Sequence, residues 1–140
     1  MGEYQKIAQF LWVGGSLSAI ERLALASFRD HGFECHLYHY HELNSVPAGI
    51  CLKDAREILP EDAIFYTDSP SGRSLANFSD LFRYALLSKR GGWWFDLDVV
   101  CLKGVNAWVV SHDLIFASTF EGEFGECSLG CVIYAANRSD

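Results

Sequence analysis

One segment, residues 91–103, constrains the fold of this chain more than any other. Its sequence, GGWWFDLDVVCLK, is apolar except for two aspartates and the terminal lysine. A strand built from such residues is normally buried on both faces, as in a parallel sheet that carries helices on each side. The segment therefore predicts a buried strand in an α/β domain.

The flanking sequence alternates between strand-like and helix-like patterns. Ser18 followed by Glu21 forms a capping box at the start of one helix, and Gly91-Gly92 ends another. The pattern predicts a single domain over residues 1–140 with a largely parallel central sheet. Besides the segment above, strands are expected at 6–14, 33–40, 62–67, 113–120 and 130–136, helices at 16–32, 52–60 and 79–92, and a polar loop at 68–74.

The two acids, Asp96 and Asp98, come late in their strand, where we expect it to leave the core. Alternate side chains of a strand share a face, which would place the two carboxylates about 6–7 Å apart. Carboxylates beside apolar surface need a compensating charge, and oxygen ligands suit Mg²⁺ or Mn²⁺. Ligands of such sheets bind beyond the carboxyl ends of the strands. The pair thus predicts a metal site, or else a solvated strand end with one acid held by an arginine.

Composition excludes several classes of protein. The net charge of −7 argues against a nucleic-acid-binding surface. Apolar runs fall short of the roughly 20 residues that span a bilayer, and the first residues lack a signal-peptide pattern. Five cysteines, an odd number, favour reduced thiols over a disulfide framework. We therefore expect a cytoplasmic protein without a transmembrane segment.

Residues WWFDLDVVCL resemble the haloacid-dehalogenase phosphatases, in which Asp96 would be the nucleophile. In that family the motif normally ends the first strand of the core, whereas several expected elements precede it here. Only 42 residues follow Asp98, too few for the later motifs of the family. The phosphatase reading is kept as an alternative.

A longer stretch, residues 77–103, resembles glycosyltransferases of the sugar-binding-region group, which includes capsular-polysaccharide, mannosyltransferase-like and clostridial-toxin-like enzymes. That group carries a helix of Ser-Asp-x-x-Arg type, then Gly-Gly, two aromatic or apolar residues, and Asp-x-Asp, all of which occur here in order. The resemblance implies a three-layer, Rossmann-like nucleotide-diphospho-sugar transferase (GT-A) fold. It also implies transfer of a sugar, with retention, from a nucleoside-diphosphate sugar, UDP favoured over GDP, to a saccharide or other hydroxyl acceptor, as in polysaccharide biosynthesis.

The resemblance also assigns roles around the metal. Asp98 would bind Mn²⁺ or Mg²⁺ directly, and Asp96 would assist through the waters of the metal and through hydroxyls of the donor. Asp80 and Arg83, three residues apart on the helix, would bind hydroxyls of the donor sugar. The catalytic base stays unassigned.

Aromatic residues complete the expected donor site. Trp12 would stack on the uracil, with Gly14 beside it allowing close approach of the nucleotide. Trp94 shares the face of the aspartates and would edge the donor pocket.

The resembling proteins continue well beyond the second strand that follows the motif. We therefore expect a fold truncated on its C-terminal side, in which residues 1–140 form the nucleotide-sugar-binding portion. Three explanations are open: the chain is a fragment, it is the product of a shortened gene that binds the donor poorly, or a partner chain supplies the acceptor half. A non-catalytic nucleotide-sugar-binding fragment is kept as an alternative to an enzyme.

Overall fold

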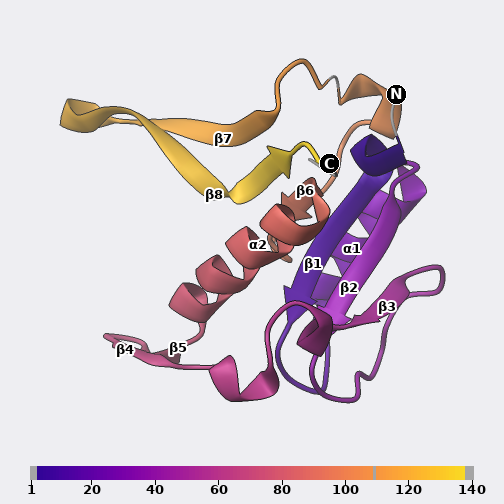
Figure 1. The fold of residues 1–140 in the computed structure, drawn as a ribbon, viewed down its shortest axis with the longest axis vertical. Coiled ribbons are helices and arrows are strands. Elements are labelled where there is room, and N and C mark those ends of the chain that lie inside the picture. Colours follow the sequence, from indigo (N-terminus) through magenta and orange to yellow (C-terminus); the bar gives the residue numbers. More distant parts are fainter. Residues whose placement is uncertain (1–2, 109, 138–140) are drawn as a thin grey trace.

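The computed structural model describes residues 3–108 and 110–137. A six-stranded sheet with the order β3-β2-β1-β6-β8-β7 forms the centre of the molecule (Figure 1). Strands β3, β2, β1 and β6 run parallel, whereas β8 pairs antiparallel with β6 and β7. The elements are β1 (Ile7–Trp12), α1 (Ala19–Asp30), β2 (Glu34–His39), β3 (Cys51–Asp54), β4 (Thr67–Ser69), β5 (Gly72–Ser74), α2 (Ala76–Arg90), β6 (Gly92–Phe95), β7 (Leu114–Glu121) and β8 (Gly125–Ala135).

Two separate cores show that the helices cover opposite faces of the sheet. On one face, Phe28 of α1 packs against Phe10 of β1 and Phe95 of β6, with ring centroids 5.4 and 4.2 Å away. On the other face, Phe82 of α2 packs against Trp94 of β6. Neighbouring residues of β6 thus enter different cores, as expected of a strand buried on both sides. The predicted α/β architecture with a mostly parallel sheet is confirmed.

The start of α1 follows the predicted capping box. The Ser18 backbone N–H donates to the Glu21 carboxylate at 2.7 Å, and the Ser18 hydroxyl donates to the same oxygen. These bonds satisfy polar groups that a helix start leaves free. They fix the helix directly after the loop that leaves β1.

The prediction for the chain between β2 and α2 was wrong in three places. Residues 52–60 form β3 and a 3₁₀ turn, Ala55–Glu57, in place of a helix, because β3 adds to the open edge of β2. Residues 62–66 form no strand, since Phe65 packs against Phe78 of α2 instead of joining the sheet, and Thr67 already belongs to β4. The expected loop at 68–74 is a small hairpin of β4 and β5.

Strand β6 ends at Phe95, one residue before the first aspartate, so the prediction that both acids share a strand face was also wrong. The Asp96 N–H still donates to the Cys131 carbonyl of β8 at 2.9 Å, but the Asp96 carbonyl accepts from Val99 N–H at 3.1 Å. This second bond closes a turn. The acids therefore lie on a turn at the carboxyl end of β6, directly beyond the sheet.

The helix after the hairpin begins at Ala76, earlier than the predicted start near Ser79. The Ala76 N–H donates to the Ser74 hydroxyl at 3.1 Å, and Ser79 already donates to the Leu75 carbonyl at 2.8 Å. Ser79 consequently faces the sheet end from inside the first turn. Within the described ranges, no helix has the length and apolar character needed to cross a bilayer.

Removal of the Phe28 ring tests the α1 core. The side chain is fully buried, so Phe28→Ala should lower the free energy of unfolding by about 3–5 kcal/mol. Urea denaturation followed by circular dichroism measures the loss. Phe124→Ala, at a ring that is 85% exposed, is the control and should change stability by less than about 0.5 kcal/mol. Equal losses in both variants would contradict the assigned core.

Candidate functional site

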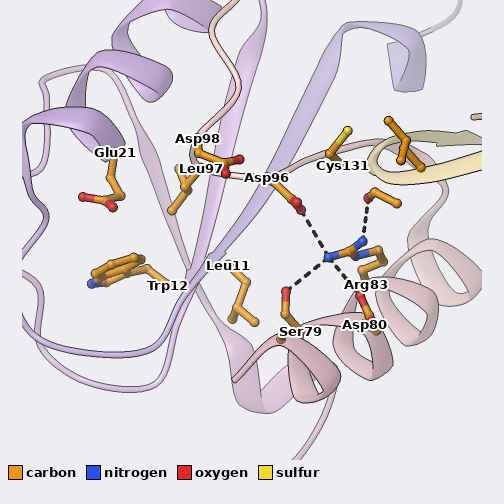
Figure 2. Close-up of a pocket in the computed structure, with 13 residues that line it drawn as sticks. Leu11, Trp12, Glu21, Ser79, Asp80, Arg83, Asp96, Leu97, Asp98 and Cys131 are labelled. Atoms are coloured by element: carbon orange, nitrogen blue, oxygen red, sulfur yellow. Dashed lines mark hydrogen bonds and ion pairs between the residues drawn. The ribbon is translucent and has the colours of Figure 1, made fainter. Parts of the chain in front are cut away.

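A cavity of about 510 Å³ opens at the carboxyl ends of β1 and β6. Its walls come from the end of β1, the first turn of α1, the turn that follows β6, the first turns of α2, and a stretch of β8 (Figure 2). The edge where parallel strands end is where α/β sheets bind ligands. The aspartate turn is therefore part of a site formed by five separate segments of the sequence.

The buried guanidinium of Arg83 joins three of these segments: α2, the turn after β6, and β8. Its Nη1 donates to the Gly130 carbonyl of β8 at 2.6 Å, and its Nη2 lies 3.2 Å from Oδ1 of both Asp96 and Asp80 (Figure 2). The residue is only 7% exposed. A buried charge is tolerated when it is paired and hydrogen-bonded, and Arg83 meets this condition through one carbonyl and two carboxylates.

Gly130 makes this position of the guanidinium possible. A Cβ at residue 130 would lie 2.1 Å from Arg83 Nη1 and 3.3 Å from its Cζ. Real Cβ atoms do not approach so closely, so the guanidinium would have to leave. The glycine is needed here for space, not for an unusual backbone conformation.

Asp96 is held by two donors at one oxygen. Trp94 Nε1 donates to Oδ1 at 2.9 Å, and Arg83 donates to the same atom. Burial raises the pKa of Asp96 above its ordinary value, and the nearby Asp98 and Asp80 add to the rise, although the Trp94 hydrogen bond and Arg83 lower it. A divalent cation at the second oxygen would favour the ionised form.

Charges in the cavity are strongly unbalanced. Glu21, Asp80, Asp96 and Asp98 line it together with a single cation, Arg83. Asp98 is exposed on the turn, and Figure 2 shows its carboxylate on the same side as that of Asp96. A cavity with four carboxylates and one guanidinium attracts cations and repels anions.

Asp96 and Asp98 fit a hard divalent cation that keeps part of its water shell. Among the described residues, no group of three or more ligating side chains could hold a metal without help. Mg²⁺ is commonly bound by one or two carboxylates plus water and substrate phosphates. The site thus has the ligand number and type of a cation shared with a ligand, and no zinc-type set.

Five of the residues selected from the sequence line this one cavity: Trp12, Asp80, Arg83, Asp96 and Asp98. They come from β1, α2 and the turn after β6, so the fold brings together three separate parts of the sequence.

Two selected residues lie outside the wall. Trp94 is 2% exposed and lies under Asp96, which it orients, and it does not line the cavity. Gly14 does not line the cavity either; it lies against Trp12, whose Nε1 would be 3.4 Å from a Cβ at residue 14.

Three polar residues of the cavity were not selected from the sequence: Glu21, Ser79 and Cys131. Ser79 was expected only to begin a helix. Glu21 was recognised only as part of the capping box, because that pattern gives it a sufficient structural role. Cys131 lies on β8, far from the motif in sequence, and only its pairing beside Asp96 brings it to the wall. No sequence signal marks such a residue.

These features define a class: an α/β domain with an acidic cavity at the carboxyl edge of its parallel strands. Comparison with known families is more specific. The model of the glycosyltransferase sugar-binding region containing the DXD motif matches residues 31–115, which is 85 of the 140 residues. The chain belongs to this family, and it is not placed among the phosphatases.

Other comparisons are more distant. Four solved chains match in structure. One of them, described as PaToxG glycosyltransferase, shares 14% identity at a TM-score of 0.47 over 71% of this chain. This chain spans 44% of the length of that protein. A search of curated proteins finds no match.

The space at Gly130 can be tested by a single methyl group. Gly130→Ala should displace the Arg83 guanidinium and lower the free energy of unfolding by about 1–3 kcal/mol, as overpacking does. Gly104→Ala is the matched control, since its φ is −58° and the nearest atom to its Cβ is 3.9 Å away. That change should leave stability equal or raise it by up to about 1 kcal/mol. Chemical denaturation of both variants decides; a harmless Gly130→Ala would refute the tight fit.

Proposed function

We propose that this chain is the donor-binding portion of a metal-dependent glycosyltransferase. It would bind a nucleoside-diphosphate sugar and take part in transfer of the sugar to a hydroxyl acceptor. The observation that carries the proposal is the pair Asp96 and Asp98 at the wall of a cavity in a chain of the DXD family.

Electrostatics support the need for a cation. A diphosphate would enter a cavity lined by four carboxylates and one guanidinium, and like charges there repel it. Asp98, with Asp96 assisting, would hold Mn²⁺ or Mg²⁺, and the ion would supply positive charge against that of the leaving diphosphate.

Other residues of the cavity and its surroundings would orient Asp96 and bind the sugar and the nucleobase of the donor. Arg83 and Trp94 fix one oxygen of Asp96 and so direct the other toward the cavity. Asp80, which is half exposed beside Arg83, is available to accept hydrogen bonds from hydroxyls of the donor sugar. The ring of Trp12 offers a flat apolar wall for the nucleobase.

The finer assignments rest on the resemblance of the motif region. It favours UDP over GDP as the nucleotide, retention at the anomeric carbon, and a saccharide acceptor, as in polysaccharide biosynthesis. We infer that the acceptor is bound mainly by protein outside residues 1–140, whether further polypeptide or a partner chain.

Removal of the metal ligand is the direct test. Replacement of groups that only support a metal ligand commonly costs about 10–100-fold in metal affinity, so Asp98→Ala should weaken Mn²⁺-dependent binding of UDP by at least about 100-fold. Isothermal titration with UDP and GDP, with and without Mn²⁺, measures this. Asp62→Ala, at an exposed acid outside the cavity, should bind normally. UDP binding that needs no metal and survives Asp98→Ala would refute the proposal.

The adjacent tryptophans offer a matched test of how Asp96 is held. Trp94→Phe removes the hydrogen bond to Asp96 and should weaken Mn²⁺ binding about tenfold. Trp93→Phe makes the same change in the other core, where Trp93 Nε1 is buried without a partner among the described residues. The Mn²⁺ affinity of Trp93→Phe should equal that of the unchanged protein. Equal Mn²⁺ affinity in both variants would show that the hydrogen bond from Trp94 to Asp96 does not contribute to metal binding.

A turnover assay distinguishes an enzyme from a module that only binds the nucleotide sugar. Release of UDP from a UDP-sugar by the purified chain, abolished by Asp98→Ala, would establish catalysis. Metal-dependent UDP binding without release or transfer would instead identify a nucleotide-sugar-binding module.

A further inference from the structure

A second cavity, of about 300 Å³, lies at the opposite ends of β1 and α2 from the first. Gln9 and the residues after Ser88 of α2 line this cavity, whereas Trp12 and the first turns of α2 line the other. Its volume is at the lower end of those typical of small-molecule sites. Neither the metal nor the donor proposed above involves it.

The charge of this second cavity is the reverse of that of the first. Lys53, Lys89 and Arg90 line it with one carboxylate, Glu57, in a chain of net charge −7. Arg90 pairs with Glu57 at 3.1 Å, and Lys89 Nζ donates to the Ile58 carbonyl at 2.7 Å. Lys53 makes no hydrogen bond or ion pair with the part of the chain that the structure describes.

Cations near the end of a helix are common, because they interact favourably with its dipole. That role accounts for Lys89 and Arg90 at the end of α2. It does not account for Lys53, which comes from β3, or for the buried polar groups described next.

Two buried polar side chains reach the same cavity with unused hydrogen-bonding capacity. Gln9 is 2% exposed; its Nε2 donates to the Gly91 and Trp93 carbonyls at 2.7 and 3.3 Å, while its Oε1 accepts no bond from the described residues. Tyr38 is also 2% exposed, and its hydroxyl makes no hydrogen bond with them. Burial raises the pKa of Tyr38, so the hydroxyl remains a donor at neutral pH. Neither atom is among the buried polar atoms without a partner, so both open on the cavity, where a ligand would find one acceptor and one donor.

From this arrangement we propose that the second cavity binds a phosphate group. The ammonium groups of Lys53 and Lys89 supply the positive charge, and the Tyr38 hydroxyl donates to a phosphate oxygen. Gln9 Oε1 can only accept, and it takes the hydrogen of the P–OH group that phosphate retains at neutral pH. Sulfate has the same shape but no such hydrogen, so the cavity discriminates between the two anions.

Amide-resolved NMR titration of the full chain with inorganic phosphate and with sulfate, at constant ionic strength, tests this. Phosphate should give saturable shifts at Gly91 and Lys53 and should bind about tenfold more tightly than sulfate, the worth of one good hydrogen bond to a charged group. Lys53→Gln should weaken phosphate binding about tenfold, and Tyr38→Phe several-fold. Lys103→Gln, which removes an exposed cation outside the cavity, should have no effect.

Two results would overturn the proposal: no saturable shift with phosphate, or equal binding of phosphate and sulfate that Lys53→Gln leaves unchanged. The second result would mean only nonspecific attraction of anions. Glucose 1-phosphate distinguishes the sources of the group. As a phosphomonoester with a second pKa near about 6, it is mostly a dianion at neutral pH and has no P–OH hydrogen for Gln9 Oε1. Weaker binding than that of inorganic phosphate therefore identifies free phosphate as the ligand, whereas equal or tighter binding would overturn the role assigned to Gln9. Because Asp98→Ala leaves this cavity intact, phosphate binding by that variant separates this inference from the proposed transferase function.

Discussion

The contact between Arg83 and Gly130 holds the site together. One guanidinium inside the protein joins α2 to β8 through a carbonyl, and to the turn after β6 through Asp96. Each of these segments is anchored elsewhere in a core of aromatic side chains, so the turn cannot shift without disturbing a buried charge. The position of the first aspartate is therefore set by the fold and not by the flexibility of a surface loop.

The same contact explains how two acids lie so near apolar surface. Asp96 is half-buried, and one of its oxygens is neutralised internally by Arg83 and Trp94. Asp98 is exposed and depends on solvent or on a ligand for compensation. The two readings that the sequence left open, an acid held by an arginine and an acid pair at a cation site, are thus compatible. Oδ1 of Asp96 accepts hydrogen bonds from Arg83 and Trp94, and the other carboxylate oxygen remains available to a ligand in the cavity.

Features that are determined by neighbouring residues could be predicted from the sequence, whereas features that are determined by the tertiary fold could not. The capping box at Ser18 and the doubly buried strand before Asp96 follow from neighbouring residues, and both were found. The helix expected at 52–60 failed because the open edge of β2, set by the tertiary fold, draws this segment into a strand. Periodicity within a short segment carries no information about such an edge.

In the candidate site, too, residues of a local sequence pattern were predicted and contacts that depend on the tertiary fold were not. Asp80, Arg83, Asp96 and Asp98 were selected because they stand in one recognisable pattern, and they share a wall of the cavity. The carbonyl of Gly130 could not be foreseen, since a backbone oxygen has no signature in the sequence. The supporting position of Trp94 also escaped prediction, because alternation along a strand shows which face a side chain takes but not whether it reaches solvent.

Helix α2 takes part in both cavities, the first turns in the acidic one and the last in the basic one. Its 15 residues make a rod about 22 Å long at 1.5 Å per residue. Inserting or deleting one residue would rotate one end against the other by about 100°, which would turn either Arg83 or Lys89 away from its carbonyl. The length of this helix is therefore as tightly constrained as the identity of the side chains at its two ends.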